Sequence, residues 1–255
     1  VDAVVVVVAG DGNGGDTGNT WRVKFNADEP GAWTATASFR EGAGVAVAVL
    51  ADETPDPAAG TPTSFDGDID QFTVAPLDPA APGFAALGRL AYNGTHYLTF
   101  PDGTSFIKAG ADSPENWLGY VGFDNTTDFG AGPNTPSGLH EFPTHGADWN
   151  PGDPDWDTPD TPGPNDGRAI IGALNYLHSV GINNIYFLPM NIGGDGKDSW
   201  PYADPNINGN GSPANDNTRF DISKLEQWEL FFQHAQDKSI LLHWVMNEAE
   251  TANKQ

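Results

Sequence analysis

The chain has 255 residues, enough for one large domain or two smaller ones, and its 35 acidic and 11 basic residues give a formal charge of −24. Such a surface repels phosphate backbones and anionic lipids, which argues against nucleic acid and membrane partners. The absence of cysteine excludes disulfides and thiol catalysis, and no apolar run approaches the roughly 20 residues of a membrane helix. The acidity is compatible with neutral sugars and divalent cations, or it serves only solubility in a salty medium.

Residues 1–76 are typical of a β-sandwich. Short segments of β-branched or alternating apolar residues are separated by turn signals, as half-buried antiparallel strands require. These segments are Val4–Ala9, Trp21–Phe25, Trp33–Phe39, Val45–Leu50 and Ile69–Val74. Residues 77–88 are rich in proline and predict a stiff linker to a second domain, residues 89–255.

The second domain begins with strands and then alternates strands with helices. A hairpin is expected from Arg89–Tyr92 and His96–Phe100 around the turn Asn93-Gly94. The segments that follow are expected to be strand Phe106–Ala109, helix Arg168–Val180, strand Asn184–Pro189, a helix from the N-cap Asp221 to about Lys238, and strand Ile240–Met246. Strands that alternate with helices predict a parallel sheet covered by helices.

The loops indicate which parallel fold is present. Long polar loops (112–167 and 191–220) follow strands, whereas only short turns join each helix to the next strand. This asymmetry favours a TIM-type β/α barrel, of which the chain would form the first three β/α units, although a doubly wound sheet uses the same local unit. Because a barrel needs about 200–250 residues, we expect the natural protein to continue beyond Gln255.

Polar and aromatic residues follow the carboxyl ends of the three expected parallel strands, where such folds place their functional sites. These candidate substrate-binding residues are Asp112, Glu115, Asn116, Trp117, Asn191, Asn247 and Glu248. Carboxylates, amides and aromatic rings are the groups that recognise sugars. Alternatively, the carboxylates cap the loop and the tryptophans pack in the core. His243, within the third strand, is interpreted as a packed histidine rather than a ligand.

Two further patterns concern bound ions and cofactors. Asp153, Asp155 and Asp157 are candidate calcium ligands, because calcium takes several oxygen ligands from flexible loops; a solvated acidic loop is the alternative. Residues 10–15 match G-x-G-x-x-G, but strand Trp21–Phe25 follows where a dinucleotide site needs a helix, so no nucleotide cofactor is expected. No cofactor is required, and calcium is the one ion that the sequence suggests.

The chain resembles bacterial multidomain proteins that carry a DUF5060 N-terminal domain. The matching stretches are Trp21–Phe25, Gly31–Thr34, Ser38–Gly42, Lys108–Asn116, Ile170–Leu177, Met190–Asp198 and Arg219–Asp221. The resemblance implies a β-sandwich joined to a glycoside-hydrolase-like barrel and a secreted, polysaccharide-degrading role. In such barrels the catalytic carboxylates commonly follow the fourth and later strands, so no catalytic residue is assigned here, and residues 247–253 depart from the expected run.

Two functional hypotheses follow. The first is a secreted glycoside hydrolase that acts on a polysaccharide through carboxylates beyond this chain, with the residues above binding the substrate. The second is a non-catalytic extracellular protein that binds sugars or serves adhesion or surface structure. A calcium-dependent structural module is a third, weaker possibility.

Overall fold

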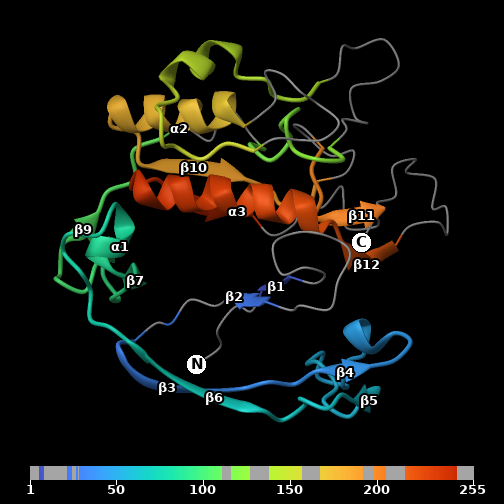
Figure 1. Ribbon diagram of the computed structural model, residues 1–255. Coiled ribbons are helices and arrows are strands. Elements are labelled where there is room, and N and C mark those ends of the chain that lie inside the picture. The colour runs from blue at the N-terminus through green and yellow to red at the C-terminus, as the bar shows by residue number, and fades with distance from the viewer. Residues whose placement is uncertain are drawn as a thin grey trace. The chain divides into compact units, whose positions relative to one another are not determined.

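The computed structural model describes residues 6–8, 22–24, 27, 29–110, 116–126, 138–156, 167–191, 198–204 and 216–245. Its contacts divide the chain into two compact units (Figure 1). The first takes in the described residues from Ala27 to Leu77, and the second takes in those from Asp78 onward together with the strand pair β1 (Val6–Val8) and β2 (Arg22–Lys24). The division after Leu77 lies one residue from the predicted domain boundary.

The first unit contains two pairs of antiparallel strands. β3 (Gly31–Thr36) pairs with β6 (Ile69–Val74) so that Trp33 lies opposite Phe72, and β4 (Arg40–Glu41) pairs with β5 (Thr61–Pro62). The predicted strand Val45–Leu50 is wrong in its first half, which forms a 3-10 turn, η1 (Val45–Val47). Two-stranded sheets are what the described residues of this unit show, so the sandwich stays a prediction.

The second unit continues with a small antiparallel sheet of β7 (Ala91–Tyr92), β8 (Leu98–Thr99) and β9 (Ser105–Phe106). The predicted hairpin is confirmed, since Asn93 Oδ1 accepts a hydrogen bond from the Thr95 amide at 3.1 Å in the turn between β7 and β8. The end of the predicted linker forms a short helix, α1 (Phe84–Leu87), whose Phe84 ring lies 5.9 Å from that of Phe100.

The expected strand Phe106–Ala109 requires a correction. Phe106 belongs to β9 and pairs antiparallel with β8, because the turn before it folds the chain back as a hairpin. Residues 107–110 then run alongside the chain that leads into β10, where the Asn183 amide donates to the Ala109 carbonyl at 2.8 Å. One backbone hydrogen bond therefore replaces the expected parallel ladder.

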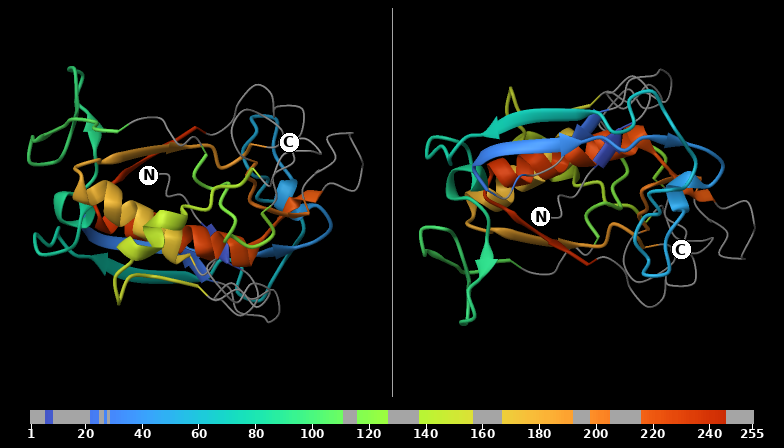
Figure 2. Two further views of the ribbon diagram at one scale, coloured as in Figure 1. Left: turned by 90° about the horizontal axis from the view of Figure 1, so that it is seen from above. Right: turned by 90° about the horizontal axis from the view of Figure 1, so that it is seen from below.

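The β/α part follows the prediction closely. Helix α2 (Arg168–Ser179) precedes β10 (Asn184–Phe187), and helix α3 (Ile222–Asp237) connects β10 to β13 (Leu241–Trp244). β10 and β13 pair in parallel, with Tyr186 opposite His243. Both helices lie on the same side of this strand pair (Figure 2). The described residues thus contain two adjacent parallel strands and no closed barrel, and the barrel stays a prediction.

Three elements, a strand pair and a 3-10 helix, occupy regions that the sequence predicts as loops. β11 (Tyr202–Asp204) and β12 (Asp216–Phe220) form an antiparallel pair directly before α3. A 3-10 helix, η2 (Pro143–Asp148), packs against α2 so closely that a Cβ added to Gly172 would overlap the His145 carbonyl oxygen. Glycine at this position therefore permits the contact between η2 and α2.

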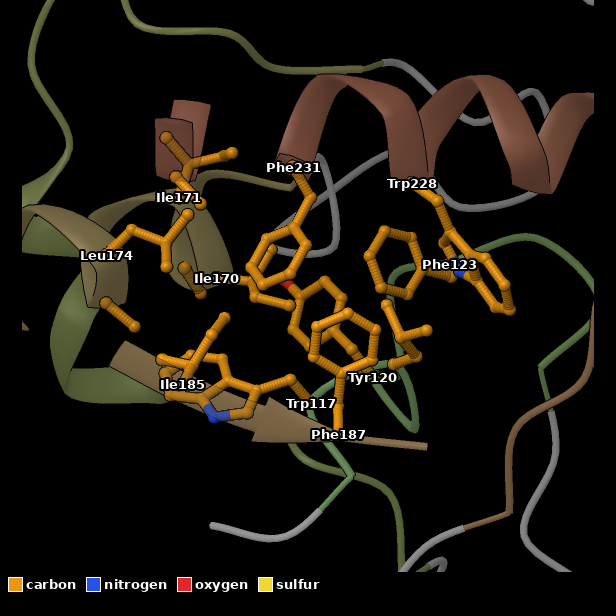
Figure 3. Packing of buried hydrophobic residues seen from close by; sticks show 14 of the residues in the cluster. Trp117, Tyr120, Phe123, Ile170, Ile171, Leu174, Ile185, Phe187, Trp228 and Phe231 are labelled. Carbon is orange, nitrogen blue, oxygen red and sulfur yellow. The ribbon is translucent and has the colours of Figure 1, made fainter. Parts of the chain in front are cut away.

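The core of the second unit fills the space between the two helices and β10 (Figure 3). The segment 116–123 enters this space and contributes four buried hydrophobic residues: Trp117, Leu118, Tyr120 and Phe123. Ile170 and Leu174 of α2, Phe187 of β10 and Phe231 of α3 have no exposed surface. No helix in the described part of the chain is long and apolar enough to cross a membrane.

Candidate functional site

Two of the predicted substrate-binding residues meet just past the carboxyl end of β10. Asn191 and Ser199 exchange two backbone hydrogen bonds of 2.8 Å each. Ser199 Oγ lies 2.7 Å from the Leu188 carbonyl oxygen and 3.1 Å from Asn116 Oδ1. Asn116 is the first residue of the core segment 116–123, so this contact ties that segment to the chain around Ser199. We call Asn116, Asn191 and Ser199 the asparagine junction.

Asn116 has an unusual backbone conformation and a buried side-chain donor without a partner among the described residues. Its φ of 63° lies in the left-handed region, which asparagine tolerates better than most residues with a Cβ. Its side chain is fully buried, and its Nδ2 has no hydrogen-bond partner within the described part of the chain. A buried donor without a partner costs about 1–3 kcal/mol. A water molecule or a ligand hydroxyl at this nitrogen would therefore be stabilised.

Beside the junction, Lys224 joins three segments of the chain. Its Nζ donates to the carbonyl oxygens of Asn125 at 3.0 Å and Trp200 at 3.3 Å, and it lies 4.8 Å from the centre of the Trp200 ring. Asp221 caps the same turn of α3, since its Oδ1 accepts from the Lys224 amide at 3.1 Å. Its Oδ2 accepts from Asn125 Nδ2 at 2.8 Å. The first turn of α3 therefore anchors the segments that contain Asn125 and Trp200.

The Lys224 ammonium group is buried, and this changes its titration. Burial lowers the pKa of Lys224 from 10.5 to about 8, although the charges of Asp221 and Asp124 oppose the change. The enclosed Lys224 side chain thus holds the backbone carbonyls of Asn125 and Trp200 in place. Sequence analysis missed it, yet Lys224 lies on the same helical stripe as Trp228, Phe231 and Ala235.

The structure corrects the role of the predicted substrate-binding residues that it describes. Trp117 is 3% exposed and stacks on Phe142 at 4.8 Å, so it is a core residue and cannot contact a polymer. The side chains of Asn116 and Asn191 are fully buried, so they shape the loops rather than face the solvent. The remaining candidates lie outside the described residues: Asp112, Glu115, Asn247 and Glu248.

His243 packs against a neighbouring ring, as predicted, although its side chain is exposed. Its ring lies edge-on to Tyr186 at 5.4 Å, and its Nδ1 lies 3.5 Å from Lys108 Nζ. We call Lys108, Tyr186 and His243 the strand-face row. The signal in the sequence is the alternation of β13, in which His243 falls on the opposite face from Leu242 and Trp244.

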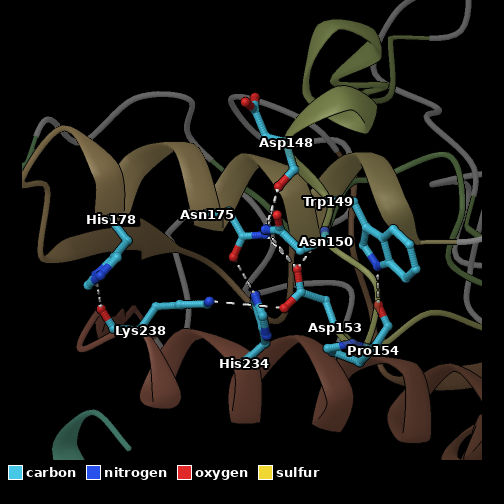
Figure 4. A network of polar contacts seen from close by, with 9 residues as sticks. All are labelled: Asp148, Trp149, Asn150, Asp153, Pro154, Asn175, His178, His234 and Lys238. Carbon is cyan, nitrogen blue, oxygen red and sulfur yellow. Dashed lines mark hydrogen bonds and ion pairs between the residues drawn. The ribbon is translucent and has the colours of Figure 1, made fainter.

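Of the aspartates predicted to bind calcium, Asp153 is surrounded by hydrogen-bond donors (Figure 4). Asp153 Oδ2 accepts from the Asn150 amide at 2.8 Å and from Asn175 Nδ2 at 2.7 Å, and Asp155 Oδ2 accepts from Arg168 at 2.9 Å. Groups of three or more His, Asp or Glu side chains suited to a metal do not occur among the described residues. Asp157 lies outside those residues. The surroundings of Asp153 and Asp155 thus do not support the calcium prediction.

Asp153 instead belongs to a network that joins the loop after η2 to both helices. Asn175 of α2 donates to Asp153, and its Oδ1 lies 2.9 Å from Nε2 of the buried His234 of α3. Burial would raise the pKa of Asp153, but hydrogen bonds from Asn150 and Asn175 outweigh it and lower the pKa. Burial lowers the pKa of His234. The charge of Lys238 lowers the pKa of His234 further. The contacts of Asn175 with Asp153 and His234 indicate a structural role for this network.

Comparisons with known proteins give no match: no family model, no curated protein and no solved structure matches this chain. The similarity to proteins with a DUF5060 domain therefore stays a prediction. The function has to be argued from the residues at the carboxyl ends of the parallel strands.

Proposed function

We propose that this chain belongs to a secreted carbohydrate-active protein that binds a polysaccharide at the carboxyl ends of β10 and β13. The observation that carries the proposal is the asparagine junction, in which residues from two loops past the expected strands meet at Ser199. In β/α folds these loops form the functional site. The left-handed backbone and the buried side chain of Asn116 support the proposal further, since they would fix the shape of the two loops that meet there.

The proposed activity is glycoside hydrolysis. It needs two carboxyl groups about 5–10 Å apart on either side of the scissile bond. Asp221 is committed to capping α3, so it is a poor candidate for either role. Asp112, Glu115 and Glu248 are proposed to bind the substrate, and the catalytic pair would come from carboxylates that follow other strands of the proposed barrel.

Non-catalytic sugar binding is the second candidate function. The engagement of Asp221 in the α3 cap favours it, because binding needs amides and aromatic rings but no free pair of carboxylates. The two candidates predict the same binding site, and they differ in whether the bound polymer is cleaved.

The test incubates the protein with plant, algal and bacterial polysaccharides and measures both retention on the insoluble polymer and release of reducing ends. Asn116→Ala should weaken retention by about tenfold, since it removes both a buried donor and the contact to Ser199. Gly146→Ala is the control, since a Cβ there has open space around it. Cleavage supports the hydrolase, and retention without cleavage supports the binding protein. If the protein retains no polymer, the proposal is wrong.

A further inference from the structure

The face of the β10–β13 pair that the helices leave uncovered carries the strand-face row. Phe187 and Trp244 turn toward α3, where their rings lie 5.6 and 5.1 Å from that of Phe232. Neighbouring residues in a strand point to opposite faces, so Tyr186 and His243 project from the other side. The parallel register places these two directly opposite one another.

Lys108 reaches the same face because Asn183 fixes the backbone on both sides of it. Asn183 Oδ1 accepts from the Ala109 amide at 2.7 Å, and its Nδ2 donates to the Ile107 carbonyl at 3.0 Å. The Asn183 amide adds a third hydrogen bond, to the Ala109 carbonyl at 2.8 Å. Two of these hydrogen bonds thus hold the peptide groups that flank Lys108, and the third holds the next one. Lys108 Nζ ends 3.5 Å from His243 Nδ1.

The strand-face row lies near the carboxyl ends of β10 and β13, where the polysaccharide site is proposed. Tyr186 and His243 are each the third of four residues in their strands, one residue before the strand ends. In a barrel the helices cover the outside, so the row would face the inside, immediately below the loops of the rim. Lys108 and His243 are exposed and Tyr186 is half-buried. In such a barrel the position of Tyr186 and His243 one residue before the strand ends would place them in the layer next to the rim.

The chemistry of the row points to a negatively charged ligand. Lysine supplies a permanent cation at neutral pH, histidine an additional donor, and tyrosine a hydroxyl donor beside an aromatic ring. Only 11 of the 255 residues are Lys or Arg, so a positioned lysine is a local exception in a strongly acidic chain. Long-range repulsion from the other charges is screened beyond about 8–10 Å at physiological ionic strength, so contacts at the row decide binding there.

We infer that Lys108, Tyr186 and His243 form a subsite for the anionic group of an acidic sugar, either the carboxylate of a uronic acid or a sulfate ester. The inference rests on the proposed function, since it names the substrate class of that site. Lys108 Nζ forms a charge-assisted hydrogen bond with the anion, and the Tyr186 ring packs against the sugar. Asn183 is a positioning residue that acts through Lys108.

The experiment measures binding by calorimetry with matched pairs of ligands. Oligogalacturonate is compared with its methyl ester, and a sulfated galactan oligosaccharide with its desulfated form. Wild type should bind one acidic member about tenfold more tightly than its neutral counterpart, the ratio expected from one charge-assisted hydrogen bond. The pair that shows the preference identifies carboxylate or sulfate.

Variants separate the subsite from general effects of charge. Lys108→Met should abolish the preference for the acidic ligand and leave binding of the neutral one unchanged. Asn183→Ala should reduce the preference in the same way, whereas Lys238→Met removes an equal charge at the far end of α3 and should keep it. Equal binding of acidic and neutral ligands by wild type overturns the inference and leaves the proposed function standing. Failure to bind either kind of ligand also overturns the inference, and retention on the wider set of polysaccharides then decides whether the proposed function stands.

Discussion

Replacing Lys224 by methionine should remove a rise in stability that wild type shows at alkaline pH. The pKa of Lys224 is lowered from 10.5 to about 8 in the fold, first of all by burial. Between these values the unfolded chain binds the proton and the folded chain does not, so the free energy of unfolding increases with pH. Below about pH 8 the folded protein carries the full cost of the buried charge.

The size of this effect follows from the two pKa values. At about 1.4 kcal/mol for each pKa unit, the protonated form is disfavoured in the fold by about 3 kcal/mol. The difference in unfolding free energy between wild type and Lys224→Met should therefore increase by about 3 kcal/mol from neutral pH to about pH 10.5. Other groups that titrate in this range, including Tyr202, are present in both proteins and cancel.

The assay is urea unfolding at a series of pH values, followed by far-UV circular dichroism, because α2 and α3 both lie in the second unit. Lys224→Arg is the first control, since arginine stays charged throughout and should show no rise. Lys238→Met keeps Lys224 and should follow wild type. Parallel curves for wild type and Lys224→Met would refute the reasoning, because they would mean that Lys224 is solvated in the folded protein.

Three further predictions concern stability. Gly172→Ala should destabilise the second unit by at least about 2 kcal/mol in urea unfolding, because its Cβ overlaps a carbonyl of η2, whereas Gly146→Ala should have little effect. Asp221→Ala should cost about 1–2 kcal/mol by the same assay and Asp221→Asn much less, since asparagine also caps helices. Because burial lowers the pKa of His234, stability should fall as pH drops below about 6.5, and His234→Gln should flatten that part of the curve. Equal acid sensitivity in His234→Gln would assign the loss to other groups.

The elements that sequence predicted well are those with local signals. The helix stripes, the cap Asp221 and the stop at Gly181 depend on residues a few positions apart, and α2 and α3 begin and end within one residue of the prediction. Pairing between distant segments has no such signal. The strand at Phe106 was therefore assigned to the wrong sheet, and β11 and β12 were missed.

The burial of the candidate site residues was not predicted from the sequence. Asn116 and Asn191, which were expected on one rim, both contact Ser199, and the rim itself stays a prediction. Their burial depends on how the loops fold back, which residue spacing does not encode. Trp117 is instructive, because the apolar run that contains Leu118, Tyr120 and Phe123 marks this part of the loop as core.

The amide of Asn183 uses both its oxygen and its nitrogen on the backbone around Lys108, and this limits what evolution can place there. Aspartate offers only acceptors, serine is too short to reach two peptide groups, and glutamine has an extra methylene that moves both atoms outward. Lineages that use the lysine should therefore keep asparagine at 183, and those that lose the lysine should be free to vary it. Coordinated substitution at positions 108 and 183 among related proteins would therefore mark those in which the proposed subsite takes a different ligand.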